Sequence, residues 1–147
     1  MRKILTIYLR RFEEIVYPVP LNPKVQEPVN KLLNRISNVH LINPLSYPDF
    51  VYARKQSYFI VTDSGDVQEE ASGPGKPVLV MRDTTERQEA VEVGAAKLVG
   101  ADFEKIGNGI KSLLTDEKEY MQMAKAHNPY GDGRAVGRII NKLIEFI

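Results

Sequence analysis

Residues 58–71, YFIVTDSGDVQEEA, contain the transition that decides the fold. The apolar run 58–61 predicts a buried strand, and the residues after the turn at 63–66 predict the start of a helix. The first backbone N–H groups of a helix have no partners within the helix, and the helix dipole favours negative charge beside them. A strand, a turn of small residues and a helix start therefore predict an anion site.

The residues around this turn are suited to a nucleotide. Ser64 and Gly65 stand at the turn, and two carboxylates, Glu69 and Glu70, follow about one helical turn later. A bound nucleotide would place its phosphate at the turn and its ribose hydroxyls against one of the carboxylates. The alternative is an ordinary helix N-terminus at which Asp63 or Ser64 is only the capping residue. The window alone leaves both interpretations open.

Short apolar segments alternate with helical patterns along the rest of the chain. Strands are expected at 15–19, 39–42, 77–81 and 95–99. Helices are expected at 2–14, 23–36, 47–56, 103–114, 117–126 and 134–146, with Asn22 as a cap and Pro23 at the first position of the second helix. Alternating helices and nearly all-apolar strands predict an α/β fold, a three-layer Rossmann-like parallel sheet with helices on both faces.

The segments that follow the strands are candidates for ligand contacts. In sheets of this kind, ligands bind outside the carboxyl ends of the strands. Residues 20–22, 63–66 and 82–87 each follow an expected strand, so we expect them along one edge of the sheet. No internal repeat or linker divides the 147 residues, and we predict a single nucleotide-binding domain over 1–147.

Composition excludes several classes of function. The formal net charge of +1 gives no electrostatic case for binding nucleic acid or an anionic membrane. Without cysteine, and with only His40 and His127 as imidazoles, we expect no metal site, no cofactor and no thiol or histidine-based catalysis. No apolar stretch approaches the roughly 20 residues of a membrane span, and the expected compartment is the cytoplasm.

Four segments resemble one family in order and spacing. They are YPV and LNP within residues 17–23, TDSGDVQEEA at 62–71, KPVLVMRDTTER at 76–87 and AHNPYGDG at 126–133. Together they resemble the non-hydrolysing UDP-N-acetylglucosamine 2-epimerases, from about Phe12 to the C-terminus. The resemblance implies the second of two Rossmann-like domains in a GT-B-type architecture, truncated at its N-terminal edge. It implies elimination of UDP and its re-addition with inversion at C2 of the sugar.

The resemblance also implies residues that contact UDP. Carried over by position, they are Phe50, Ser64, Gly65, Glu70, Arg82 and Arg87. Ser64 and Gly65 are expected to meet the diphosphate, while Phe50 packs against the uracil. Glu70 is expected to bind the ribose hydroxyls, and the two arginines to lie near the phosphates or the sugar. As alternatives, Phe50 is a core residue and the arginines form surface ion pairs.

The chain departs from the family pattern at three positions. Pro20 stands where family members carry His, and Gln88 where they usually carry Pro. Asp66 replaces the second glycine of the Ser-Gly-Gly turn. A carboxylate about 5 Å from a phosphate costs roughly 3 kcal/mol at an effective dielectric near 20. The departures weaken the expectation that this chain retains a diphosphate site.

Three hypotheses follow. The first is the UDP-binding half of an epimerase that has no turnover alone, because elimination needs groups on both sides of the sugar. The second is a non-catalytic nucleotide-binding or oligomerising fragment. The third is a glycosyltransferase C-terminal domain, which the string at 83–87 disfavours. Expected partners are UDP or a UDP-sugar, an N-terminal domain supplied in trans, and a second copy that pairs with an open edge of the truncated sheet.

Overall fold

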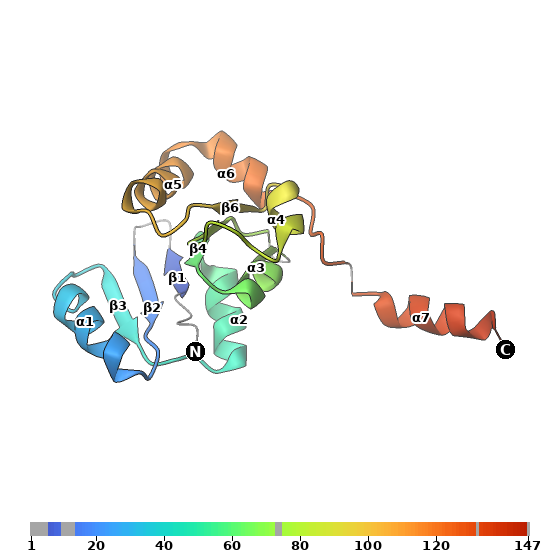
Figure 1. Cartoon of the computed structure of the whole chain (residues 1–147), viewed down its shortest axis with the longest axis horizontal. Helices are drawn as coiled ribbons and strands as arrows, with labels where there is room; N and C mark the ends of the chain where they lie inside the picture. The colour runs from blue at the N-terminus through green and yellow to red at the C-terminus, as the bar shows by residue number, and fades with distance from the viewer. Residues whose placement is uncertain (1–5, 10–13, 73–74, 132, 147) are drawn as a thin grey trace.

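The computed structural model describes residues 6–9, 14–72, 75–131 and 133–146, which contain one six-stranded sheet with helices on both faces (Figure 1). The strands are β1 (Thr6–Leu9), β2 (Ile15–Pro18), β3 (Val39–Ile42), β4 (Phe59–Thr62), β5 (Val78–Val80) and β6 (Ala96–Leu98). Their order across the sheet is β3-β2-β1-β4-β5-β6. This is the order of a doubly wound fold, whose connections reverse direction at the centre. The predicted Rossmann-like fold is confirmed.

Strand β1 runs against its neighbours. It pairs antiparallel with β2 and β4, whereas the pairs β2–β3, β4–β5 and β5–β6 are parallel. The helix predicted over residues 2–14 is therefore wrong at Thr6–Leu9, and residues 2–5 and 10–13 lie outside the described residues. A short apolar run with β-branched residues is compatible with a helix or a strand. Here the hydrogen bonds that β1 forms with strands on both sides decide for the strand, despite the helical spacing of the apolar residues.

The position of β1 also corrects the expected open edge. The strand lies between β2 and β4, at the centre of the sheet, and the two edges of the described sheet are β3 and β6. A strand missing from the position of β1 would therefore leave a gap in the middle of the sheet and not an unpaired strand at its edge. The expected self-association therefore loses the particular edge on which it was based.

The helices follow the predicted order, with one addition. They are α1 (Pro23–Leu33), α2 (Tyr47–Gln56), α3 (Gly65–Ser72), α4 (Gln88–Glu92), α5 (Phe103–Thr115), α6 (Glu117–Ala124) and α7 (Ala135–Ile144). The short helix α4 is not predicted from the sequence. Asn22 caps α1 as expected, because its Oδ1 accepts the Lys24 N–H at 3.0 Å and Pro23 begins the helix.

Alternate residues of β4 pack against the two helical layers. Phe59 and Val61 belong to the core beneath α5 and α6, which includes Leu113. Ile60 belongs to the core beneath α2, α3 and α4, which includes Val67. All three β4 residues are at most 1% exposed. The start of α3 therefore follows directly on a fully buried strand of the sheet.

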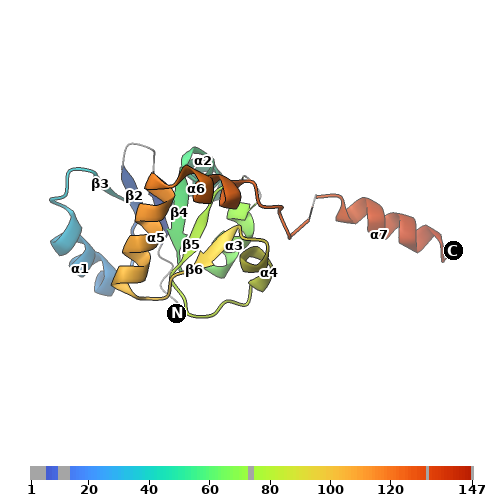
Figure 2. The same cartoon turned by 90° about the horizontal axis from the view of Figure 1, so that it is seen from above.

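Helix α7 extends away from the rest of the molecule (Figures 1 and 2). Its apolar residues recur at helical spacing and are at least half exposed: Val136, Ile139, Ile140, Leu143 and Ile144. The helix therefore contributes little to the core around the sheet. None of the described helices has the length and hydropathy needed to cross a bilayer.

Candidate functional site

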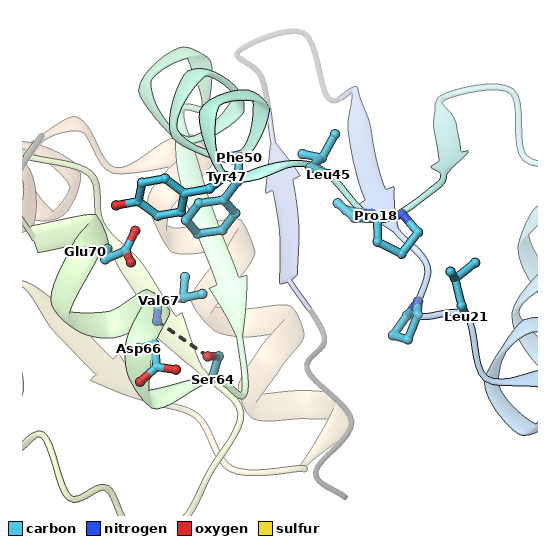
Figure 3. A pocket seen from close by; sticks show the side chains of 11 residues that line it. Pro18, Leu21, Leu45, Tyr47, Phe50, Ser64, Asp66, Val67 and Glu70 are labelled. Atoms are coloured by element: carbon cyan, nitrogen blue, oxygen red, sulfur yellow. Dashed lines mark hydrogen bonds between the residues drawn. The ribbon is translucent and has the colours of Figure 1, made fainter.

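A groove of about 570 Å³ lies beyond the carboxyl ends of β2, β3 and β4 (Figure 3). Its lining is mostly apolar and comes from the segments after β2 and β3 and from α2 and α3: Pro18, Pro20, Leu21, Pro44, Leu45, Tyr47, Phe50, Ser64, Asp66, Val67 and Glu70. A mostly apolar groove with a few polar groups is typical of a small-molecule site. It lies at the edge where ligands of doubly wound sheets bind.

The turn before α3 has the expected strand–turn–helix geometry. Ser64 is 6% exposed and directly precedes Gly65, the first residue of α3. The Ser64 N–H donates to Thr62 Oγ1 at 3.1 Å, and Ser64 Oγ accepts the Val67 N–H at 3.5 Å. Ser64 is thus a capping residue that also lines the groove. Its contact with a diphosphate remains a prediction.

Phe50 and Glu70 reach the same groove from different helices. Figure 3 shows the Phe50 and Tyr47 rings on α2 beside the Glu70 carboxylate on α3. The rings of Tyr47 and Phe50 are stacked with centroids 6.3 Å apart. Phe50 is half-buried, packs against the core and also lines the groove. Both expectations for Phe50, core and groove, are therefore compatible with its position.

The two arginines expected near the ligand are not among the residues that line this groove. Arg82 Nε donates to the carbonyl of Asp63 at 2.5 Å, and its Nη1 donates to Glu86 Oε2 at 3.0 Å. Arg87 forms an ion pair with Glu69. Both arginines therefore form ion pairs in this structure, and their contact with a ligand remains a prediction. Arg82 nevertheless lies against the turn, because it holds the backbone of Asp63.

Carboxylates gather around the start of α3. Asp66 is exposed in the first helical turn and lines the groove. A Cβ built on Gly65 would lie 3.3 Å from Glu86 Oε1, so this carboxylate stands beside the first helical residue. Burial, followed by the charge of Asp63, raises the pKa of Tyr17 above its ordinary value of 10.0. The turn that is expected to hold phosphate thus has the carboxylates of Asp66 and Glu86 near it, with Glu86 paired to Arg82.

Sequence reasoning missed two buried polar residues behind the groove. Gln68 is 0% exposed, donates to the Ser64 carbonyl at 3.1 Å and accepts the Thr85 hydroxyl at 2.8 Å. Arg54 is 8% exposed and donates to Glu70 at 2.7 Å. Their spacing in the sequence could have identified them. Gln68 lies four residues after Ser64 and Arg54 four residues after Phe50, so each shares a helix face with a predicted site residue.

The part of the chain that the structure describes contains no group of three or more His, Asp or Glu residues positioned to hold a metal ion. His127 is exposed, and His40 is exposed and paired with Glu14. The lining of the groove itself offers apolar side chains, backbone groups and the carboxylates of Asp66 and Glu70.

The strand order, the turn at Ser64 and the groove define a Rossmann-like α/β domain with a groove at the carboxyl edge of its sheet. A model of the family described as UDP-N-acetylglucosamine 2-epimerase matches residues 2–144. The chain belongs to the UDP-N-acetylglucosamine 2-epimerase family, which confirms the resemblance in the sequence. The glycosyltransferase alternative is not supported.

Similar curated proteins are much longer than this chain. The UDP-N-acetylglucosamine 2-epimerase of Campylobacter jejuni is 60% identical over 132 residues, which are 90% of this chain and 34% of that protein. The corresponding protein of Bacillus subtilis is 51% identical over 146 residues, 98% of this chain and 38% of that protein. The chain thus spans about a third of the length of the curated relatives it matches.

Solved structures show the same fold. The S. aureus MnaA–UDP co-structure is 47% identical with a TM-score of 0.82, over 89% of this chain and 36% of that chain. The UDP-GlcNAc 2-epimerase from Neisseria meningitidis bound to UDP-GlcNAc is also 47% identical with a TM-score of 0.82, over 88% of this chain and 36% of that chain.

Proposed function

We propose that residues 1–147 form a single UDP-binding domain of a UDP-GlcNAc 2-epimerase. The observation that carries this proposal is that Phe50, Ser64 and Glu70, which come from two helices and a turn, line one groove at the carboxyl edge of the sheet. Two similar structures, from S. aureus and Neisseria meningitidis, are complexes with UDP and with UDP-GlcNAc. In the proposed complex, Phe50 packs against the uracil, Glu70 accepts the ribose hydroxyls, and Ser64 and Gly65 meet the diphosphate.

The proposed chemistry is conversion of UDP-GlcNAc to UDP-ManNAc by elimination and re-addition of UDP. Elimination needs a base at C2 of the sugar and a proton donor at the leaving oxygen, placed on opposite sides of the sugar. The groove supplies one wall, and its residues bind and orient the nucleotide. We therefore expect this chain to have no appreciable turnover unless a separate chain supplies the facing wall. Clear epimerisation of UDP-GlcNAc by the purified chain would contradict this expectation.

Calorimetric titration with UDP tests the binding function. Dissociation constants in the micromolar range would support a functional groove, while no binding up to millimolar UDP would contradict the proposal. Phe50→Ala is expected to weaken binding, because the ring forms part of the groove. Phe103→Ala is the matched control, since Phe103 is 90% exposed on α5 and does not line the groove.

A second candidate is a non-catalytic nucleotide-binding or oligomerising fragment. Asp66 and Pro20 favour it, because both line the groove at positions where the family pattern has glycine and histidine. Titration with UDP together with an epimerisation assay separates the two: binding without turnover, even with a complementary epimerase domain added, supports the fragment. We further propose a cytoplasmic location and self-association of the isolated chain. The exposed apolar residues of α7 and the edge strands β3 and β6 support self-association.

A further inference from the structure

Arg54 is a buried cation behind the groove. It lies in the last turn of α2 and is 8% exposed, although arginine is rarely buried without a partner. Its Nη1 donates to Glu70 Oε2 at 2.7 Å, across the interface between α2 and α3. Its guanidinium carbon lies 5.5 Å from the centroid of the Phe50 ring. One side chain therefore contacts both of the groove residues expected to bind a nucleoside.

The Arg54–Glu70 pair acts on geometry more than on stability. Burying an ion pair costs desolvation energy that its attraction only roughly repays, so such pairs contribute little net stability. The Glu70 side chain is 33% exposed and has several rotamers available in water. A hydrogen bond from a buried guanidinium holds Oε2 toward α2 and so fixes the direction in which Oε1 points. The pair thus selects one orientation of the Glu70 carboxylate.

The same guanidinium also constrains Phe50. Arg54 follows Phe50 by four residues, so the two side chains share one face of α2. A cation near the face of an aromatic ring is attracted to it, and the attraction strengthens when the cation is buried. The position of the ring and the orientation of the carboxylate are therefore set by one group.

We propose that Arg54 is a positioning residue that orients Glu70 toward the ribose hydroxyls and Phe50 toward the base of a bound nucleotide. This inference rests on the proposed function, because it assigns Arg54 to the same groove. Its contribution is specificity for the ribose: without Arg54, the carboxylate is free to turn away from the hydroxyls while the groove itself persists.

The test compares UDP with 2′,3′-dideoxy-UDP by calorimetry on the full chain. Arg54→Met removes the charge and keeps an apolar side chain, and Arg54→Lys keeps the charge but loses the planar fork. Lys55→Met is the matched control, because Lys55 is the exposed neighbour on α2. We expect the parent to prefer UDP by about tenfold, as a hydrogen bond to a charged group implies. We expect this ratio to approach one in Arg54→Met, to be intermediate in Arg54→Lys and to be unchanged in Lys55→Met.

A double variant keeps the test decisive if Arg54→Met leaves Glu70 unpaired and unfolds the chain. Arg54→Met with Glu70→Gln removes both charges, and we expect its ratio to equal that of Glu70→Gln alone. The positioning role is overturned if folded Arg54→Met keeps the parent's preference for UDP over 2′,3′-dideoxy-UDP. It is also overturned if the double variant and Glu70→Gln differ in this ratio. If the parent binds neither nucleotide, the proposed function fails and the positioning role fails with it.

Discussion

Asp66→Asn is expected to strengthen UDP binding. Asp66 occupies the second position of α3, where it faces the groove and where the resemblance expects a glycine beside the diphosphate. Asparagine preserves the size of the side chain and removes its charge. If phosphate binds at the start of α3, its oxygens and the Asp66 carboxylate repel each other, and the substitution relieves this repulsion.

The size of the effect follows from Coulomb's law. Two unit charges about 5 Å apart repel by about 3 kcal/mol at an effective dielectric near 20 and by about 0.8 kcal/mol in water. Asp66 is exposed, so its effective dielectric lies between these limits. The expected gain in UDP affinity is therefore between about 4-fold and about 150-fold. It should be larger at low salt, because exposed charges are screened.

Calorimetry with UDP and with uridine, at two salt concentrations, measures the effect. Uridine carries no phosphate, so its affinity should not change. The N-terminus of α3 should become less stable by about 0.3–1 kcal/mol, because the negative charge of Asp66 interacts favourably with the helix dipole there. Glu104→Gln is the matched control, since Glu104 holds the same second position in α5, away from the groove. Equal UDP affinities of parent and Asp66→Asn at low salt would refute a phosphate position at this turn.

The remaining predictions concern stability, pH and assembly. Ile7→Pro should lower the free energy of unfolding by about 1–3 kcal/mol in urea titrations, because it removes a hydrogen bond from a strand paired on both sides; no change would contradict the central position of β1. Gly109→Val should cost about 1–3 kcal/mol through overpacking, since an added Cβ would lie 3.2 Å from a β5 side-chain carbon. Gly107→Val, with nothing within 4 Å of its Cβ, is the control. A hydrogen bond from Lys97 is the main cause that lowers the pKa of Glu119 below its ordinary value of 4.5. Its stabilisation should therefore be complete above about pH 4.5 and lost as the pH falls below it, so thermal unfolding of parent and Glu119→Gln should converge in acid. Light scattering should show self-association of the isolated chain, and a single-chain mass at all concentrations would oppose it.

The fold could be predicted because its signals are local. The strands β2 to β6 are short apolar runs, and capping residues such as Asn22 and prolines such as Pro23 mark where helices begin. Six of the seven helices of the described chain were expected from apolar spacing, caps and the turn after β4. The helix α4 was missed, because it has five residues and too few turns for a periodic pattern.

Strand β1 shows where local signals fail. Residues 4–15 carry apolar groups at helical spacing, but the segment at Thr6–Leu9 forms a strand because β2 and β4 offer hydrogen-bonding partners on both sides. That choice depends on residues about 10 and 50 positions away in the sequence. Single-sequence periodicity contains no information about such partners, so the antiparallel direction of β1 could not be predicted.

The candidate site likewise contains residues that the sequence predicts and residues that it does not. Ser64, Phe50 and Glu70 were found by motif position, and the structure brings them to one groove. Arg54 and Gln68 were not found, because a charged or amide side chain on an amphipathic helix is ordinarily assigned to solvent. Their burial arises only when α2 and α3 are packed against the sheet and their partners are in place. Polar groups behind a site are therefore the part of it that sequence patterns describe least well.

The groove has two parts with different degrees of match to the family pattern. The part expected to hold the base and ribose retains Phe50 and Glu70, and a buried arginine links them. The part expected to hold the diphosphate keeps Ser64 and Gly65 but has the Asp66 carboxylate where the family pattern has glycine. Because base stacking and hydroxyl binding depend little on that charge, whereas phosphate binding depends on it directly, affinity for the nucleoside should persist where affinity for the diphosphate is reduced. The difference between uridine and UDP binding thus measures how far the groove has departed from the family's substrate.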